Sequence, residues 1–310
     1  MAARNDSGSP PLHTLPLSVF EDAHASLIRG TLYGVATPIG NAADISLRAL
    51  AVLSAADIIC AEDTRVTGQL LARYGIQSRL VSVREHNERT MADKVIGWLA
   101  EGQLVAQVSD AGTPAVSDPG ARLVAAVREA GYRVVPVPGA CAAVTALSAA
   151  GLATTEWLFY GFLPPKASAR RKQLEAWREA SFAVVLYEAP HRMAECTADI
   201  VAVMGADRRV TLARELTKTF ETFRTLPADE MADWVATDSN QQRGECVLVI
   251  EAAPAAAAIE ALDEAARHTL DILLAELPPK QAVKLAATLT GVPRDVLYAY
   301  AVARRQATEA

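Results

Sequence analysis

Short apolar runs alternate with helical patterns through the first half of the chain. Strands are expected at residues 31–36, 57–61, 79–83, 104–109 and 132–137, with helices between them at 44–50, 64–74, 90–100, 121–130 and 140–150. The strands of a parallel sheet are covered on both faces by connecting helices, so they read as continuously apolar. The alternation predicts an α/β fold with a parallel sheet, in which Asp44 lies near the N-cap of the first helix.

A second block of the same kind follows residue 151. Its strands are expected at 157–160, 182–188, 209–214 and 246–251, and its helices at 169–179, 192–204 and 228–236. An alanine-rich linker at 252–258 then leads to three short amphipathic helices punctuated by prolines. We therefore predict a flexible leader at 1–29, a parallel α/β domain at 30–151, a mixed α/β domain at 152–252 and a helix-turn-helix-like module at 259–310.

The composition narrows the cellular setting. No apolar run of the sequence approaches the roughly 20 residues that span a bilayer, so we expect no membrane span. Cys60, Cys141, Cys196 and Cys246 lie far apart without any C-x-x-C pair, which favours buried thiols in a reducing cytoplasm over disulfides or a metal site. The net charge of -6 argues against a uniformly basic nucleic-acid binder but allows a local basic patch.

Three loops that follow predicted strands are candidates for ligand binding. Thr37–Asn41 is a sharp turn at the carboxyl end of the first strand, where α/β proteins place ligands. The loop 109–120 after the fourth strand is much longer than the usual connection of about 2 to 6 residues, and its small residues permit close approach to a ligand. Val137–Ala142 turns the chain after the fifth strand. The sequence lacks the glycine patterns of a nicotinamide Rossmann site and of a P-loop, so both are unlikely. The long loop 109–120 can hold an adenosyl-type ligand.

Seven motifs at these loops and strand ends carry a resemblance to a known family. They read ATPIGN from Ala36, AEDTR from Ala61, SDAGTPAVSDPG from Ser109, VPG from Val137, FYGFLP from Phe159, YEAPHR from Tyr187 and ARELTK from Ala213. In this order they resemble the signatures of the ribosomal RNA small subunit methyltransferase I family, which has the tetrapyrrole-methylase fold. The resemblance covers residues 30–251, and the C-terminal helices resemble that family's helix-turn-helix appendage.

The resemblance implies a class III S-adenosylmethionine (SAM) methyltransferase with two α/β domains, a cofactor cleft between them and a small helical module. It implies methyl transfer to the ribose 2′-hydroxyl of a cytidine in the decoding region of 16S rRNA, with that RNA or the small ribosomal subunit as partner, a homodimer and a cytoplasmic location. The family's cofactor contacts, carried onto this chain, fall on Pro38, Ile39, Gly40, Asp110, Ala111, Gly112, Thr113, Gly139, Ala140, Cys141, Ala189, Pro190 and Gly244. Other tetrapyrrole methylases have a glycine-rich loop ending in Asp where this chain has Pro38–Asn41, which argues against a porphyrinoid substrate.

Polar residues at two strand ends are candidates for the chemistry. Methylation of a hydroxyl requires alignment of that hydroxyl and removal of one proton. We expect Asp63, oriented by Arg65, to position or deprotonate the ribose hydroxyl, whereas we interpret Glu62 as a surface ion pair. His191 and Arg192 are expected to complete the site from the second domain. The residues leave the identity of the base open.

A basic segment early in the second domain is a candidate RNA contact. Lys166, Arg170, Arg171 and Lys172 lie together without an intervening acid and follow the aromatic run 157–160. Taken alone, such a run is typical of a solvated helix face, but with the family resemblance it favours contacts to phosphate. Two alternatives stay open: a small-molecule, tetrapyrrole-type SAM methyltransferase, and a non-catalytic RNA-binding protein of the same fold.

Overall fold

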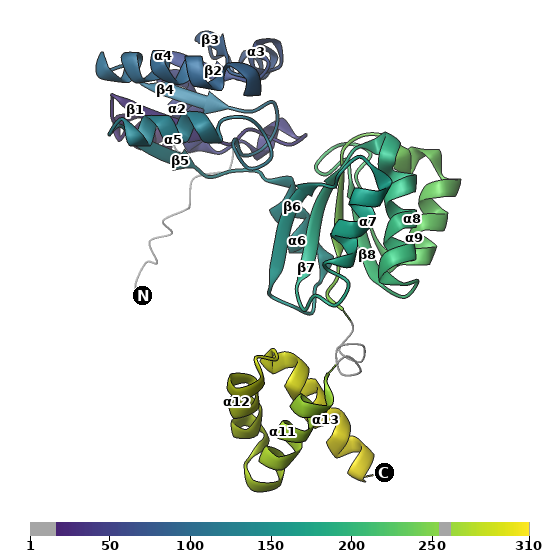
Figure 1. Cartoon of the computed structure of the whole chain (residues 1–310). Coiled ribbons are helices and arrows are strands. Elements are labelled where there is room, and N and C mark those ends of the chain that lie inside the picture. The colour runs from purple at the N-terminus through teal and green to yellow at the C-terminus, as the bar shows by residue number, and fades with distance from the viewer. Residues whose placement is uncertain (1–16, 254–261, 310) are drawn as a thin grey trace, which may run out of the picture. The chain divides into compact units, whose positions relative to one another are not determined.

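The computed structural model describes residues 17–253 and 262–309. Figure 1 labels the helices and strands of the chain, which divides by its internal contacts into two compact units. The first unit comprises Met1–Thr145 and the short segment Leu216–Thr219, and the second comprises Ala146–Glu215 and Phe220–Ala310. The segment Leu216–Thr219 therefore packs with the first unit although its chain neighbours belong to the second.

The first unit contains a five-stranded, entirely parallel sheet, as the sequence predicts. Its strand order is β3-β2-β4-β1-β5. The strands are β1 (Thr31–Val35), β2 (Ile58–Ala61), β3 (Arg79–Ser82), β4 (Val105–Val108) and β5 (Arg133–Val137). Because β1 lies between β4 and β5, the loops that follow these three strands begin next to one another.

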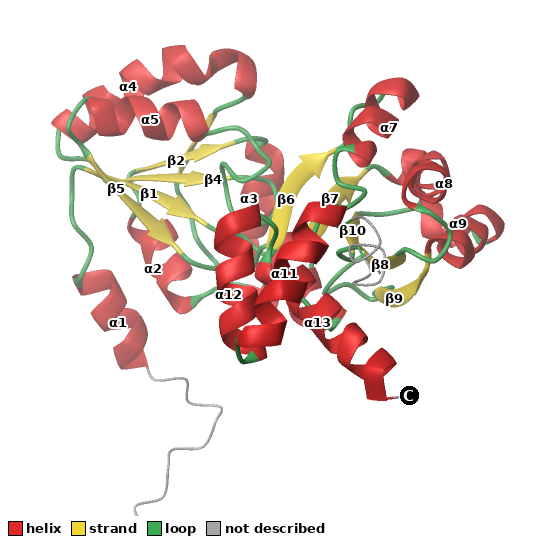
Figure 2. Cartoon of the chain, turned by 60° about the horizontal axis from the view of Figure 1, so that its bottom comes forward, coloured by secondary structure: helices red, strands yellow, loops and turns green. Residues whose placement is uncertain are grey.

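Helices cover both faces of this sheet (Figure 2). On one face, α2 (Leu47–Ala55) and α3 (Thr64–Arg73) pack on a core that includes Val35 and Ile59. On the other face, α4 (Glu88–Ala100) and α5 (Ala121–Glu129) pack on a core that includes Leu32 and Ile58. Successive strand residues thus face opposite cores, which explains why the strands read as continuously apolar. The last helix of this region, α6 (Ala142–Ala150), contains the division between the two units.

The structure adds detail to two expectations near the amino terminus. The leader is not flexible throughout, because α1 (Leu17–Ala25) forms within it and contacts α2; residues 1–16 lie outside the described residues. Asp44 lies near the N-cap of α2, as predicted, but the helix itself begins three residues later than expected, at Leu47. Asp44 ends the 3-10 turn η1 (Ala42–Asp44), and α2 is capped by Ser46, whose Oγ accepts a hydrogen bond from the Ala49 amide at 3.1 Å.

The second unit contains the mixed sheet that the sequence predicts, with order β6-β7-β10-β8-β9. Its strands are β6 (Trp157–Phe162), β7 (Ala183–Glu188), β8 (Arg209–Arg214), β9 (Thr222–Pro227) and β10 (Cys246–Ile250). β6 and β7 are parallel, and the other neighbours are antiparallel. β9 was not predicted. It is an edge strand of half-buried and exposed residues, so its sequence lacks a buried apolar run.

Three helices build the core of this unit against one face of the sheet. They are α7 (Ala167–Glu175), α8 (Met193–Met204) and α9 (Ala228–Thr237). Short 3-10 turns precede α8 and β10, namely η3 (Pro190–Arg192) and η4 (Ser239–Gln242). Cys246 at the start of β10 pairs with the last residues of β7 and β8, Glu188 and Arg214. The chain segments after β7 and β8 and before β10 therefore meet at one edge of the sheet.

The helical module follows at the carboxyl end of the chain. Its helices are α11 (Glu264–Glu276), α12 (Pro279–Thr290) and α13 (Arg294–Glu309), which confirms the three predicted helices. They share a small core of their own around Leu270, Ala286 and Leu297. Most of the predicted linker 252–258 lies outside the described residues. None of the helices described is long and apolar enough to cross a membrane.

Candidate cofactor and catalytic site

The three predicted cofactor loops of the first unit contact one another at the carboxyl ends of the strands. Thr37 and Gly112 exchange two backbone hydrogen bonds, from the Thr37 amide to the Gly112 oxygen at 2.9 Å and from the Gly112 amide to the Thr37 oxygen at 3.0 Å. Thr113 Oγ1 donates to the backbone oxygen of Ala140 at 3.0 Å. The loop after β4 is therefore tied to the loop after β1 on one side and to the loop after β5 on the other.

Gly112 shows why this meeting point requires glycine. Its φ of 80° lies in the left-handed region, and a Cβ there would lie 3.3 Å from Ile39 Cγ2 and 3.6 Å from the backbone oxygen of Ala140. A side chain would therefore crowd Ile39 and Ala140 where the three loops meet. The geometry thus fits an adenosine-type ligand, which needs close backbone approach at the carboxyl edge of a parallel sheet.

The predicted cofactor residues fall into two groups. One group belongs to the three loops of the first unit: Pro38, Ile39, Gly40, Asp110, Ala111, Gly112, Thr113, Gly139, Ala140 and Cys141. The other group, Ala189, Pro190 and Gly244, belongs to the sheet edge of the second unit where β7 ends and β10 begins. The structure brings together the members of each group, and their roles toward a cofactor stay predictions.

Asp63 and Arg65 make the contact that the sequence predicts. Asp63 caps α3 by accepting from the Arg65 amide at 2.8 Å, and the Arg65 guanidinium donates to both carboxylate oxygens, from Nε at 3.0 Å and from Nη2 at 2.6 Å. These hydrogen bonds and the charge of Arg65 hold the pKa of the Asp63 carboxyl far below its usual range. A carboxylate stabilised in this way is a weak proton acceptor, so the geometry argues against Asp63 as the base.

Glu62, which the sequence analysis set aside as a surface ion pair, has the opposite environment. Partial burial and the charges of Asp110 and Asp118 raise the pKa of the Glu62 carboxyl, whereas a hydrogen bond from the Asp110 backbone and the charge of Arg84 oppose this rise less strongly. The segment is joined to the long loop because the Asp63 amide donates to Asp110 Oδ1 at 3.0 Å. A half-buried carboxylate with a raised pKa at the edge of the cofactor loops is better suited to accept a proton.

His191 and Arg192 lie in η3 of the second unit. His191 is exposed, whereas the Arg192 side chain is partly buried and contacts other parts of the unit. Arg192 Nη2 donates to the backbone oxygens of Leu163 at 2.8 Å and Pro164 at 3.2 Å, and its Nε lies 3.3 Å from Glu188 Oε1. The guanidinium thus links the chain after β6 to the chain after β7. These contacts favour a structural role for Arg192 over the predicted role in the chemistry.

The basic segment contains one clear correction. Arg170 is only 1 % exposed, and its Nε donates to Asp199 Oδ2 at 2.5 Å. Burial acts to lower the pKa of Arg170, but the hydrogen bond and charge of Asp199 outweigh it and raise that pKa. An arginine held inside the unit does not contact RNA phosphates, so the prediction for Arg170 is wrong. Lys166, Arg171 and Lys172 are exposed and stay candidates.

Cysteines and possible metal ligands complete the survey of reactive groups. Cys60, Cys196 and Cys246 are buried free thiols, as predicted, and Cys141 is partly buried. Burial raises the pKa of the Cys60 thiol to about 12, and burial with nearby carboxylates raises that of Cys246 to about 11. Within residues 17–253 and 262–309, no cluster of three or more His, Cys, Asp or Glu side chains is arranged to hold a metal ion.

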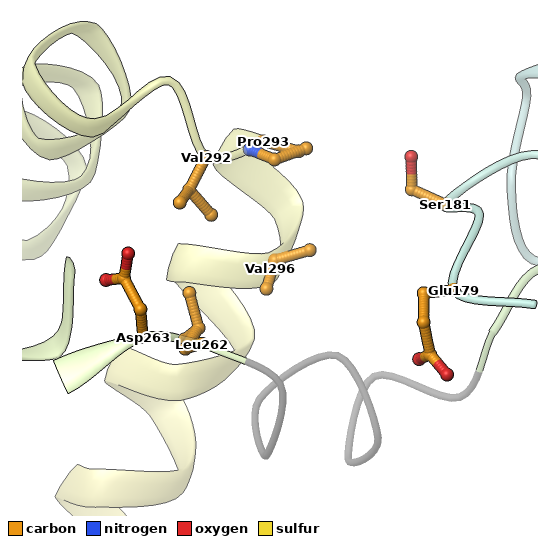
Figure 3. Close-up of a pocket in the computed structure, with 7 residues that line it drawn as sticks. All are labelled: Glu179, Ser181, Leu262, Asp263, Val292, Pro293 and Val296. Atoms are coloured by element: carbon orange, nitrogen blue, oxygen red, sulfur yellow. The ribbon is translucent and has the colours of Figure 1, made fainter.

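The lining of one surface hollow in the second unit includes none of the predicted site residues. It is lined by Leu262, Asp263, Val292, Pro293 and Val296 of the helical module and by Glu179 and Ser181 before β7 (Figure 3). Apolar side chains dominate the module's part of the lining, and its two carboxylates offer nothing that an RNA phosphate would favour. We assign this hollow no function.

Known proteins match both the α/β part and the helical module. The model of the Tetrapyrrole (Corrin/Porphyrin) Methylases matches residues 31–232, and that of the RsmI C-terminal HTH domain matches residues 260–305. Ribosomal RNA small subunit methyltransferase I of Neisseria meningitidis serogroup A is 56% identical over 278 residues, 90% of this chain and 95% of that protein. The protein of that name from Pseudomonas aeruginosa is 51% identical over 276 residues, 89% of this chain and 98% of that protein.

The chain belongs to the ribosomal RNA small subunit methyltransferase I family. The predicted resemblance is thereby confirmed.

Solved structures confirm the fold expected of this family. Cobalt precorrin-4 methyltransferase matches with a TM-score of 0.55 at 16% identity, covering 73% of this chain and 98% of its own. Diphthine synthase matches with a TM-score of 0.57 at 15% identity, covering 72% of this chain and 90% of its own. At such identities the likeness shows the tetrapyrrole-methylase fold and carries no argument about the substrate.

Proposed function

We propose that this member of the family is a SAM-dependent methyltransferase that methylates the ribose 2′-hydroxyl of a cytidine in the decoding region of 16S rRNA. Its membership of the family supports methyl transfer to ribosomal RNA. The structural observation that carries the proposal is the meeting of three cofactor loops with the Glu62–Asp63 segment at one sheet edge, through the 3.0 Å bond from the Asp63 amide to Asp110. The loops and the carboxylate to which the proposal assigns these tasks thus belong to one unit.

The reaction assigns separate tasks to these groups. When bound, SAM supplies an already activated methyl group, so the protein needs no further activating group. The backbone of Asp110–Thr113 and Gly139–Cys141 binds the adenosyl portion, and the loop contacts keep that backbone in place. Alignment of the ribose oxygen contributes up to about 7 to 11 kcal/mol in favourable cases. The Glu62 carboxylate would accept the proton that the ribose hydroxyl loses when its oxygen bonds to the methyl group and the methyl–sulfur bond breaks, with S-adenosylhomocysteine as the leaving group.

The test is a map of ribose methylation in small-subunit RNA from cells with and without this gene, read by mass spectrometry. The proposal expects one 2′-O-methylcytidine of the decoding region to disappear with the gene and to return when purified protein and SAM are added to the isolated subunit or RNA. An unchanged map would contradict the RNA substrate. SAM-dependent methylation of a tetrapyrrole would support the small-molecule alternative, and RNA binding without methyl transfer would support the non-catalytic one.

The exposed part of the basic segment is expected to contact phosphate. Replacing Lys166 and Lys172 together by Ala should weaken RNA binding and reduce the slope of log K against log salt by about 0.7 to 0.9 for each lost contact. SAM affinity should stay unchanged. The measurement is a salt titration of RNA binding.

Two arginines provide the control for this double variant. Arg73 and Arg128 are exposed and lie in the last turns of α3 and α5. These helices run antiparallel to the strands, so their last turns lie at the sheet edge opposite the proposed cofactor loops. Replacing both by Ala removes the same net charge and should leave the salt slope unchanged. Equal slopes for the lysine variant and the wild type would identify the segment as a solvated helix face. The homodimer and the cytoplasmic location expected from the resemblance stay predictions.

A further inference from the structure

The segment Leu216–Thr219, which we call the inserted segment, leaves no space beside the turn Pro38–Asn41. A Cβ built on Gly40 would lie 2.7 Å from Thr217 Oγ1, 2.5 Å from Lys218 Cγ and 3.0 Å from the backbone oxygen of Leu216. Lys218 is flexible and can move away, but a backbone oxygen cannot move without the segment. Position 40 is therefore a glycine because the inserted segment passes directly over it.

Thr217 also makes a hydrogen bond to this turn. Its Oγ1 accepts from the Asn41 amide at 3.0 Å, between residues 176 positions apart in sequence. The Asn41 side chain is engaged as well, because its Oδ1 accepts from the Ala43 amide at 3.0 Å and caps η1. The other end of the turn is fixed by the paired hydrogen bonds between Thr37 and Gly112. The turn is thus held at its start by the long loop and at its end by Thr217.

The backbone around the inserted segment adopts a conformation that is costly for its residue types. Glu215 has a φ of 51° and Thr217 a φ of 66°, both in the left-handed region, which is rare for a β-branched residue such as Thr. Residues in this region persist where the surrounding structure over-determines them, and they gather at functional sites. This conformation directs the Thr217 hydroxyl at the turn while the chain reverses between β8 and β9.

The stems of the segment are fixed within the second unit. The Glu215 amide donates to the Glu245 oxygen at 2.9 Å, and Glu215 Oε1 accepts from the Glu245 amide at 2.9 Å. Gly244 allows this contact, because a Cβ there would lie 2.4 Å from Glu215 Oε1. On the other stem, buried Arg214 donates from Nη2 to the Phe220 oxygen at 3.1 Å. Both ends of the segment are therefore held where it leaves and re-enters the second unit.

We propose that Thr217 is a positioning residue for the cofactor turn: its hydroxyl holds the Asn41 amide, and through it the turn Pro38–Asn41, in the conformation that binds SAM. The role in SAM binding rests on the function proposed above, whereas the hold on the turn does not. Three other residues support this contact. Glu215 and Gly244 fix the stem of the inserted segment, and Gly40 leaves space for it.

The experiment compares Thr217→Val with Thr217→Ser in the full chain. Val keeps the β-branch and the backbone strain but removes the hydroxyl, so the Asn41 amide should exchange its hydrogen at least about tenfold faster in ligand-free protein. SAM affinity, measured by calorimetry, should fall about fivefold, which is the net effect of one hydrogen bond. Under saturating SAM the methylation rate should approach the wild-type value, because only binding is impaired. Ser retains the hydroxyl and should restore both exchange and affinity.

A matched control is Thr237→Val at the end of α9, where the hydroxyl is exposed and donates to the Asp233 oxygen of its own helix at 2.7 Å. This variant makes the same chemical change and should alter neither exchange at Asn41 nor SAM affinity. Unchanged Asn41 exchange in Thr217→Val would overturn the proposal, as would faster exchange with unchanged SAM affinity. If the wild type binds no SAM, the proposed function fails, and the exchange measurement alone still decides whether Thr217 holds the turn.

Discussion

Replacing Glu62 by Gln is expected to slow single-turnover methylation by about 100-fold to 10,000-fold, the usual contribution of a general base. The carboxylate is removed while its size and its place beside Asp110 are kept, so SAM affinity and thermal stability should change little. The rate of the wild type should be lost as pH falls through the Glu62 pKa, since only the deprotonated carboxylate accepts a proton. Because burial, Asp110 and Asp118 raise that pKa, the loss should begin at a higher pH than for an ordinary glutamate.

Asp63→Asn is the matched comparison one residue away. Asn is itself a good helix cap, and the Asp63 carboxylate is engaged by Arg65, so we expect less than about a tenfold loss of rate. The methylation rate of Asp63→Asn should still fall at low pH as the wild-type rate does, whereas the rate of Glu62→Gln should no longer depend on pH in this range. A larger loss in Asp63→Asn at unchanged stability and SAM affinity would return the role of base to Asp63. Full activity of both variants would direct the search to His191.

Replacing Arg170 by Met is expected to lower the free energy of unfolding by about 3 to 5 kcal/mol, because Asp199 would keep a buried charge without its buried partner. The Asp199 side chain is only 4% exposed, and Arg170 binds it from inside the unit. Urea titration of the full chain, followed by fluorescence and by circular dichroism, measures the loss. RNA affinity, corrected for the folded fraction, should not change.

Arg171→Met provides the control on the same carboxylate. Arg171 donates to Asp199 Oδ1 at 2.6 Å, but 58% of its side chain is exposed, so solvent screens this pair. Its removal should cost less than about 1 kcal/mol. Equal losses in the free energy of unfolding for the two arginine variants would show that the buried ion pair stabilises the unit no more than the exposed one.

The parallel sheet and the three loops at the carboxyl ends of its strands could be predicted because they are local consequences of sequence. A buried strand must be apolar on both faces, and a loop at its carboxyl end must contain small residues if a ligand approaches. Arg170 was misread as surface charge, although a signal existed: it lies four positions before Leu174, which places both on one face of α7 toward the core.

Other features of the site depend on residues that are distant in sequence. The raised pKa of Glu62 arises from Asp110 and Asp118 in the loop after another strand, and periodicity carries no information about such neighbours. The role of Thr217 depends on a left-handed backbone and on a glycine 177 positions earlier, and on a hydrogen bond over 176 positions. β9 was missed for a local reason, since an edge strand with one partner needs little apolar character.

The membership of Leu216–Thr219 in the first unit also affects the order in which that unit is completed during synthesis. Its sheet and helices are encoded before residue 146, so they are free to form as soon as this part of the chain has left the ribosome. The contact between Asn41 and Thr217 closes a loop of 176 positions, whose entropic cost must be met late. The turn Pro38–Asn41 therefore gains its last partner only after β6, β7 and β8 have been translated, so it is completed later than the parallel sheet from which it extends.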